Sequence, residues 1–170
     1  EIVGQASDWD APTSVAAWRA RDVVGHLTSW LPGMLAGTVE LPPAASDEHP
    51  ADAWRAQTDA VQALLDDPAT AGVMYRSSTM GDVPVTQVLG QCYVPDVVMH
   101  AWDLGRSAGL DVELDPDLCA EFLQLGAEME EMMRASGQFG PRVDVEPGAS
   151  PTRRLVGFIG RDPEWTPPDA

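Results

Sequence analysis

The sequence predicts an all-α protein, a bundle of about four main helices joined by short irregular insertions. Apolar residues recur at helical spacing along several segments, and three of these segments carry a proline near their first turn, where helices tolerate it. With 170 residues, 44% of them hydrophobic, the chain is long enough to bury a core of its own. We therefore predict a single helical domain over residues 1–170.

The first helix is expected to run from near Ser14 or Trp18 to about Ala36. Pro32 falls inside this span and is expected to bend or end the helix locally, because proline lacks the amide hydrogen that a helix interior uses. The apolar positions that follow the helical period are Val23, Leu27, Trp30, Leu31, Met34 and Leu35.

The second helix is predicted after a linker rich in proline and acid, residues 37–50. Asp47 is a candidate cap, and Pro50 suits the first turn. The helix is expected to stop before Pro68, because the residue preceding a proline disfavours helical geometry. Its apolar residues are Trp54, Val61, Leu64 and Leu65.

The third helix is expected from Pro84 to a closing glycine, Gly109, after an irregular or short extended stretch over residues 69–83. Pro95 lies within it and leaves the carbonyl of Gln91 unpaired. Such a proline either kinks the helix and shapes a ligand site, or marks a tolerated kink or a helix restart. The sequence favours neither interpretation.

A further helix is expected from about Asp115 to Ala135, with Pro116 at its start. Its inner face is predicted to carry Leu118, Phe122, Leu125 and Met129. Three methionines are expected to serve as core filler or as a pocket wall: Met129, Met132 and Met133. The last element is a short helix or strand over residues 153–160.

The charge of the chain excludes several kinds of partner. Its 27 acidic and 10 basic residues give a net charge of −17. So negative a chain is unsuited to the phosphate backbone of nucleic acids and to anionic membrane surfaces. We therefore expect no nucleic-acid and no membrane partner.

The two cysteines, Cys92 and Cys119, form neither a disulfide framework nor a CxxC motif. The chain has no secretory signal and no apolar run long enough to span a bilayer, so a cytoplasmic location is expected. It opens at Glu1 without an initiator methionine, the pattern of a chain that lacks a leading segment.

Two nearly identical pentapeptides carry the strongest functional signal, residues 22–26 (DVVGH) and 96–100 (DVVMH). Each places an aspartate four residues before a histidine, so on a helix the two side chains share one face. A single pair of this kind is usually a helix salt link worth a few tenths of a kcal/mol. The duplication, which uses two of the three histidines, instead favours a divalent metal held between two helices.

Four stretches of the sequence resemble the DinB-like superfamily of metal-binding four-helix bundles. The likeness is greatest to the actinobacterial branch related to the N-terminal domain of mycothiol-dependent maleylpyruvate isomerase. The stretches are residues 18–27 (WRARDVVGHL), 96–109 (DVVMHAWDLGRSAG), 137–140 (GQFG) and 155–163 (LVGFIGRDP).

The resemblance implies a ligand set. In that family one histidine on an early helix and an acid-x-x-x-His pair on a later helix hold the metal. Carried onto this sequence, the ligands are His26, Asp96 and His100. The isomerase has glutamate where this chain has Asp96, so the reach of this carboxylate differs. Two imidazoles and one carboxylate leave coordination positions open, as in catalytic sites, with Zn²⁺ the leading metal and Ni²⁺, Fe²⁺ or Mn²⁺ as alternatives.

Two further aspartates are expected around these ligands. Asp22 is interpreted as a supporting or helix-start residue. Asp103 is expected either to orient an imidazole or to pair with Arg106, and to serve at the surface or behind the ligands. Catalytic residues beyond the metal ligands are not identified by the sequence.

Three other side chains have two interpretations each. Cys92, one turn before Asp96, lines the site or is a buried, inert thiol. Trp30 and Trp102 wall the pocket or pack in the core. His49, in the polar linker, is expected to be solvated. Two arginines, Arg76 and Arg142, are candidates for holding a substrate carboxylate.

The resemblance implies a metal-dependent enzyme that activates a low-molecular-weight thiol, with mycothiol as the candidate cosubstrate. The thiolate would add to an activated double bond and give isomerisation, or displace a leaving group and give S-transfer. A second hypothesis is a metal-dependent hydrolase in which water is the nucleophile and Asp22 or Asp103 the base. A third is a non-catalytic metal-binding or stress-response protein, whose site would be closed by Cys92 or Asp22. A homodimer is compatible with all three.

Overall fold

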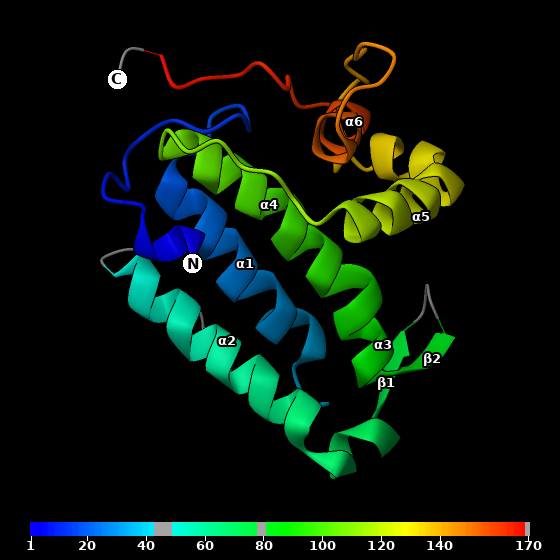
Figure 1. The fold of residues 1–170 in the computed structure, drawn as a ribbon. Coiled ribbons are helices and arrows are strands. Elements are labelled where there is room, and N and C mark those ends of the chain that lie inside the picture. Colours follow the sequence, from blue (N-terminus) through cyan, green and yellow to red (C-terminus); the bar gives the residue numbers. More distant parts are fainter. Residues whose placement is uncertain (43–48, 78–80, 169–170) are drawn as a thin grey trace.

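The computed structural model describes residues 1–42, 49–77 and 81–168, and over these residues the chain is mostly helical (Figure 1). A two-stranded antiparallel sheet is the exception. The all-α prediction is thus confirmed in its coarse form. The proposed cap Asp47 lies outside the described residues.

The first long helix, α1, spans Ala20–Leu35 and begins later than the sequence suggested. The preceding residues form a loop instead, in which Pro12 and Arg19 make an isolated antiparallel bridge. Pro32 does not end α1, which continues to Leu35. Leu31 and Leu35 are both fully buried on either side of this proline, so tertiary packing holds the last turn in place.

The second long helix, α2, spans Pro50–Asp66, with Pro50 in its first turn as predicted. Figure 1 shows α1 and α2 side by side and running in the same direction. A short 3₁₀ helix over Pro68–Gly72 follows. The stretch predicted as irregular or extended then forms the two strands, β1 (Met74–Ser77) and β2 (Gly81–Pro84).

The third helical row runs back along α1 and consists of three consecutive pieces (Figure 1). These are α3 (Val85–Val88), a π-helical segment (Leu89–Tyr93) and α4 (Val94–Ser107). Pro95 sits in the first turn of α4, directly after the wide π turn. A π turn is a recognised way to accommodate a break in the helical hydrogen-bond ladder. The helical row is therefore irregular just before Pro95, and it continues through this residue.

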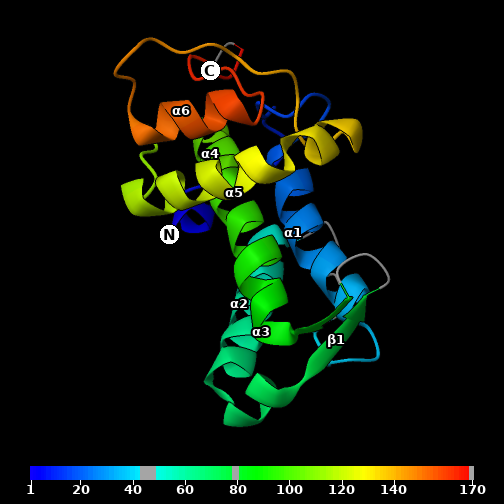
Figure 2. The same ribbon diagram turned by 90° about the vertical axis from the view of Figure 1, so that its right-hand side faces the viewer.

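The last two helices, α5 (Pro116–Ala135) and α6 (Pro151–Phe158), pack on each other across one end of α4 (Figure 2). The final element is thus a helix rather than a strand. Figures 1 and 2 show α5 and α6 as a pair beside the three rows of α1, α2 and α3–α4, so a four-helix bundle is not confirmed.

The core of the described residues consists of three apolar clusters. One joins α1 to the α3–α4 row, a second joins α5 to α6, and a third surrounds the start of α1. Two methionines predicted as core or pocket residues, Met129 and Met132, are exposed instead, by 37% and 56%. Met133 packs against the cluster between α5 and α6. No helix among the described residues combines the length and apolarity that crossing a bilayer requires.

Candidate metal centre

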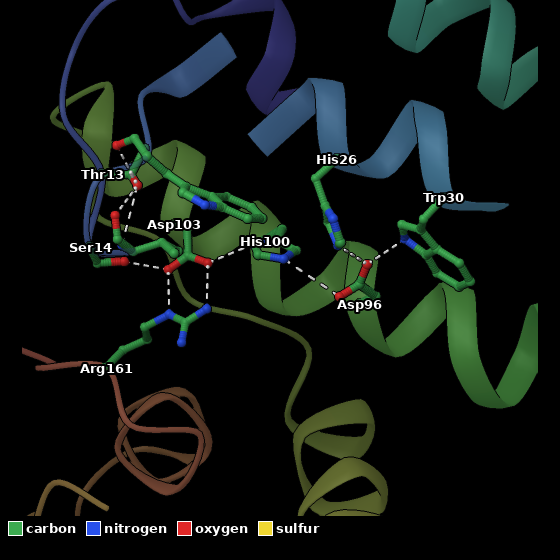
Figure 3. Close-up of polar contacts among 10 residues, drawn as sticks. Thr13, Ser14, His26, Trp30, Asp96, His100, Asp103 and Arg161 are labelled. Carbon is green, nitrogen blue, oxygen red and sulfur yellow. Dashed lines mark hydrogen bonds and ion pairs between the residues drawn. The ribbon is translucent and has the colours of Figure 1, made fainter. Parts of the chain in front are cut away.

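Three side chains meet between α1 and α4: His26 from α1, and Asp96 and His100 from α4 (Figure 3). One donor atom from each lies within 4.8 Å of the others. The Nε2 atom of His26 is 3.0 Å from Oδ2 of Asp96, and Nε2 of His100 is 3.5 Å from Oδ1. The carboxylate thus lies between the two imidazoles.

Local helix geometry explains this arrangement. Asp96 and His100 are four residues apart, so they occupy one face of α4. Trp30 stands four residues after His26 on α1, and its indole N–H donates to Oδ2 of Asp96 at 2.9 Å. Of the two interpretations of Trp30, the structure supports a place at the site.

The aspartate of the first pentapeptide has a different position. The carboxylate of Asp22 accepts the backbone N–H of Arg19 at 2.7 Å and so stabilises the start of α1. Asp22 does not belong to the donor group that the described residues form. The two similar pentapeptides thus place their histidines together and their aspartates apart.

Asp103 lies directly behind His100 and is fully buried. Its Oδ2 is 2.8 Å from Nδ1 of His100, and its Oδ1 accepts from Nε of Arg161 at 3.1 Å and from the hydroxyl of Ser14 (Figure 3). Burial acts to raise the pKa of this carboxyl, but the hydrogen bond to His100 and the charge of Arg161 outweigh it, so the pKa is lowered. Asp103 therefore orients an imidazole, one of the two predicted roles.

The other predicted role of Asp103, a pair with Arg106, is wrong. Of the two expected places, at the surface or behind the ligands, Asp103 has the second. Arg106 donates instead to the backbone carbonyl of Trp165, at 2.8 and 3.1 Å. The arginine beside Asp103 is Arg161, which the sequence analysis quoted in a family stretch without giving it a role.

An ionised carboxylate accepts hydrogen bonds and cannot donate them, so Nδ1 of His100 carries the proton that faces Asp103. In the neutral ring the lone pair is then on Nε2, the atom that faces Asp96. Carboxylates commonly support metal-binding histidines in this way. The geometry thus suits His100 as a ligand through Nε2.

Trp18 covers the two imidazoles from the loop that precedes α1. Its ring is stacked on His100 at 5.4 Å between centroids and tilted against His26 at 5.1 Å. Its carbonyl oxygen accepts the backbone N–H and the hydroxyl of Thr13. The preceding residue, Ala17, has a φ of 65°, a left-handed conformation that costs energy for a residue other than glycine. Strained backbone therefore accompanies the placement of this ring.

Solvent access differs among the three candidate ligands. The side chain of His26 is 33% exposed and that of Asp96 21%, whereas that of His100 is 8% exposed. The site is therefore approached from the side of His26 and Asp96 and supported from behind at His100. Solvent therefore reaches the donor group at His26 and Asp96.

The remaining predicted residues lie elsewhere. Cys92 packs against the cluster that joins α1 to the α3–α4 row, and burial raises the pKa of its thiol. Trp102 is buried. Arg142 is paired with Glu130 of α5, at 2.5 Å, rather than with the site, and Arg76 lies on β1. His49 is exposed, as expected.

The donor set defines a class of protein: a mainly helical chain with a partly open nitrogen and oxygen site that suits a divalent metal. Comparison with known families identifies the family to which the chain belongs. The model of the mycothiol maleylpyruvate isomerase N-terminal domain matches residues 3–105, and the chain belongs to this family.

Individual relatives also resemble the chain along most of its length. These are the uncharacterized proteins MT0763, from Mycobacterium tuberculosis strain CDC 1551, and Rv0738, from a second strain of that species. Each is 27% identical over 167 residues, which cover 92% of this chain and 87% of the relative. No solved structure matches the chain.

Proposed function

We propose that the protein is a metal-dependent enzyme of the mycothiol-dependent isomerase or thiol S-transferase type. A divalent metal, with Zn²⁺ as the leading candidate, would be held by His26, Asp96 and His100. The observation that carries the proposal is the convergence of these three donors within 4.8 Å on one partly exposed face. Membership of the mycothiol maleylpyruvate isomerase N-terminal domain family supports the choice of thiol chemistry.

A bound divalent metal would supply Lewis acidity, which converts a coordinated thiol into a thiolate at neutral pH. The protein's own side chains prepare the site for that chemistry. Trp30 holds the carboxylate of Asp96, and Asp103 holds the ring of His100. Trp18 packs its ring against both imidazoles. The thiol would approach from the side on which His26 is exposed.

A water-based hydrolase is less well supported by the arrangement of carboxylates. It needs a general base, and the two candidates from the sequence were Asp22 and Asp103. Asp22 is occupied at the start of α1, and Asp103 is enclosed behind His100 with Ser14 and Arg161. Both carboxylates thus already have hydrogen-bond partners of their own.

A purely structural metal is also less well supported. That hypothesis called for Cys92 or Asp22 as a fourth ligand. The donor group formed by the described residues has three members and includes neither of them. Three protein ligands with room for an external one are typical of catalytic zinc sites.

The proposal is tested with cobalt-substituted protein, because a thiol that coordinates cobalt gives a charge-transfer absorption. We expect added mycothiol to produce this band in the wild type and in the control His49→Ala, and to give none in His100→Ala. Ester and amide probes without thiol are assayed in parallel. Metal-dependent probe turnover with no thiol band would refute the thiol mechanism and favour the hydrolase.

A further inference from the structure

Arg161 reaches the candidate metal centre from a part of the chain outside the family match. The match ends at residue 105, whereas Arg161 follows α6. Its Nε lies 3.1 Å from Oδ1 of Asp103, and its Nη2 lies 3.4 Å from Oδ2. Arg161 therefore spans both oxygens of the carboxylate that supports His100 (Figure 3).

The backbone holds Arg161 firmly in this position. Its N–H donates to the carbonyl of Val156 at 2.8 Å, which closes the end of α6. Gly160, the residue before it, has a φ of 90°, and an added Cβ there would lie 2.6 Å from the backbone of Gly140. A close backbone approach that requires glycine thus fixes where the arginine side chain begins.

The burial of Asp103 makes its partners necessary. Its side chain is 0% exposed and that of Arg161 is 13% exposed, so solvent does not substitute for a lost partner. A buried carboxylate is stable only when it is paired and hydrogen-bonded. Arg161 supplies the positive charge of this arrangement, while the hydroxyl of Ser14 and Nδ1–H of His100 complete it.

We propose that Arg161 is a positioning residue for His100, acting through Asp103. By spanning both oxygens of the carboxylate, it fixes the orientation in which Oδ2 receives the Nδ1–H of His100. The ring is thereby held with Nε2 directed at Asp96. This inference rests on the proposed metal site, and it makes the segment after α6 a part of that site.

Metal affinity provides the first test, measured by competition with a chromogenic chelator. Loss of a residue that supports a metal ligand typically weakens metal binding by about 10–100-fold. We expect Arg161→Met to weaken zinc binding by about 10-fold or more, and Arg161→Lys by less, because lysine keeps the charge but loses the planar fork. The control is Arg106→Met, which releases the Trp165 carbonyl without touching Asp103 and is expected to bind zinc like the wild type.

A double-mutant cycle separates positioning from general support of the fold. In an Asp103→Asn background, Arg161→Met is expected to cause little further loss of zinc affinity, because the group it acts through is already altered. Circular dichroism of each metal-free variant verifies folding, and Arg161→Lys provides the test if Arg161→Met does not fold. Wild-type zinc affinity in a folded Arg161→Met protein would overturn the inference. So would an equal loss of zinc affinity from Arg161→Met with Asp103 intact and in the Asp103→Asn background.

A second readout does not require metal. Long-range proton–nitrogen correlation spectra of the metal-free protein report which ring nitrogen of each histidine carries the proton. We expect His100 as the Nδ1–H tautomer in the wild type and in Arg106→Met, and a mixture of tautomers in Arg161→Met. An unchanged tautomer in Arg161→Met refutes the positioning role. Absence of zinc binding by the wild type instead refutes the proposed function, so the two failures are distinct.

Discussion

The indole N–H of Trp30 provides a direct test of how Asp96 is held. It donates to Oδ2 at 2.9 Å, and the same oxygen faces Nε2 of His26 at 3.0 Å. If His26 held a metal through Nε2, Trp30 would be the N–H donor that still orients the carboxylate of Asp96. Trp30→Phe removes this donor and keeps an aromatic ring beside Tyr93, on which the Trp30 ring packs edge-to-face.

The expected effect follows from the strength and exposure of this hydrogen bond. A hydrogen bond to a charged group contributes about 1.5–3 kcal/mol. Asp96 is 21% exposed, so water replaces part of the loss and the lower end applies. We therefore expect Trp30→Phe to cost about 1.5 kcal/mol of binding free energy, a loss of about tenfold in zinc affinity.

Chelator competition measures this loss, and Trp102→Phe is the matched control. It makes the same chemical change on α4 at a buried residue whose ring lies beside Arg106. We expect it to lower the free energy of unfolding and to leave zinc affinity unchanged. Wild-type zinc affinity in Trp30→Phe, or an equal loss in both variants, would refute the reasoning.

Three further predictions concern reactivity and stability. Burial raises the pKa of the Cys92 thiol, so iodoacetamide at pH 8 should alkylate it more slowly in the folded protein than after denaturation. Hydrogen bonds from two arginines hold the pKa of Glu130 at about 2, below its usual 4.5. The ionised carboxylate of Glu130 then stabilises the folded state fully above pH 4.5, and this contribution is lost as the pH falls toward 2. The urea midpoints of wild type and Glu130→Gln should therefore converge over this range. An added Cβ at Gly126 would lie 2.7 Å from the ring of Phe158, so Gly126→Ala should destabilise by about 1–3 kcal/mol in urea denaturation. The control is Gly25→Ala in α1, where an added Cβ would meet no atom within 4 Å, and it should stabilise the folded protein by about 0.5–1 kcal/mol. A folded state that Gly25→Ala destabilises more than Gly126→Ala would contradict the packing argument.

Local pattern was sufficient to predict much of the helical framework. Proline at the first turn correctly marked the starts of α2 and α5. An irregularity of the helix near Pro95 was also predicted, because a proline removes one N–H from the helical hydrogen bonds. The start of α1 was predicted too early, because the loop before it is held by a bridge between Pro12 and Arg19 that periodicity does not report.

The centre of the candidate site was predictable for the same local reason. The i, i+4 spacing places Asp96 and His100 on one face, and the repeated motif indicated His26 as their partner. That these residues bind a metal stays a prediction. Arg161 and Ser14 could not be assigned, because they reach Asp103 from loops 58 and 89 residues away in the chain. Contacts between distant loops leave no periodic signal in a sequence.

The outward position of Met129 and Met132 has a similar explanation. Helical periodicity identified an apolar face on α5 but could not show how much of it α6 covers. The partner of that face is a helix from Pro151 to Phe158, which is shorter than α5. Part of the stripe of methionines is thus left at the surface.

Elemental analysis of tag-free protein shows whether His26, Asp96 and His100 hold a divalent metal. We expect about one equivalent of a transition metal in the wild type and in His49→Ala, whose altered residue is exposed and does not belong to the donor group. We expect none in His100→Ala. A wild type without metal, or a metal content that neither His26→Ala nor His100→Ala changes, would contradict the account.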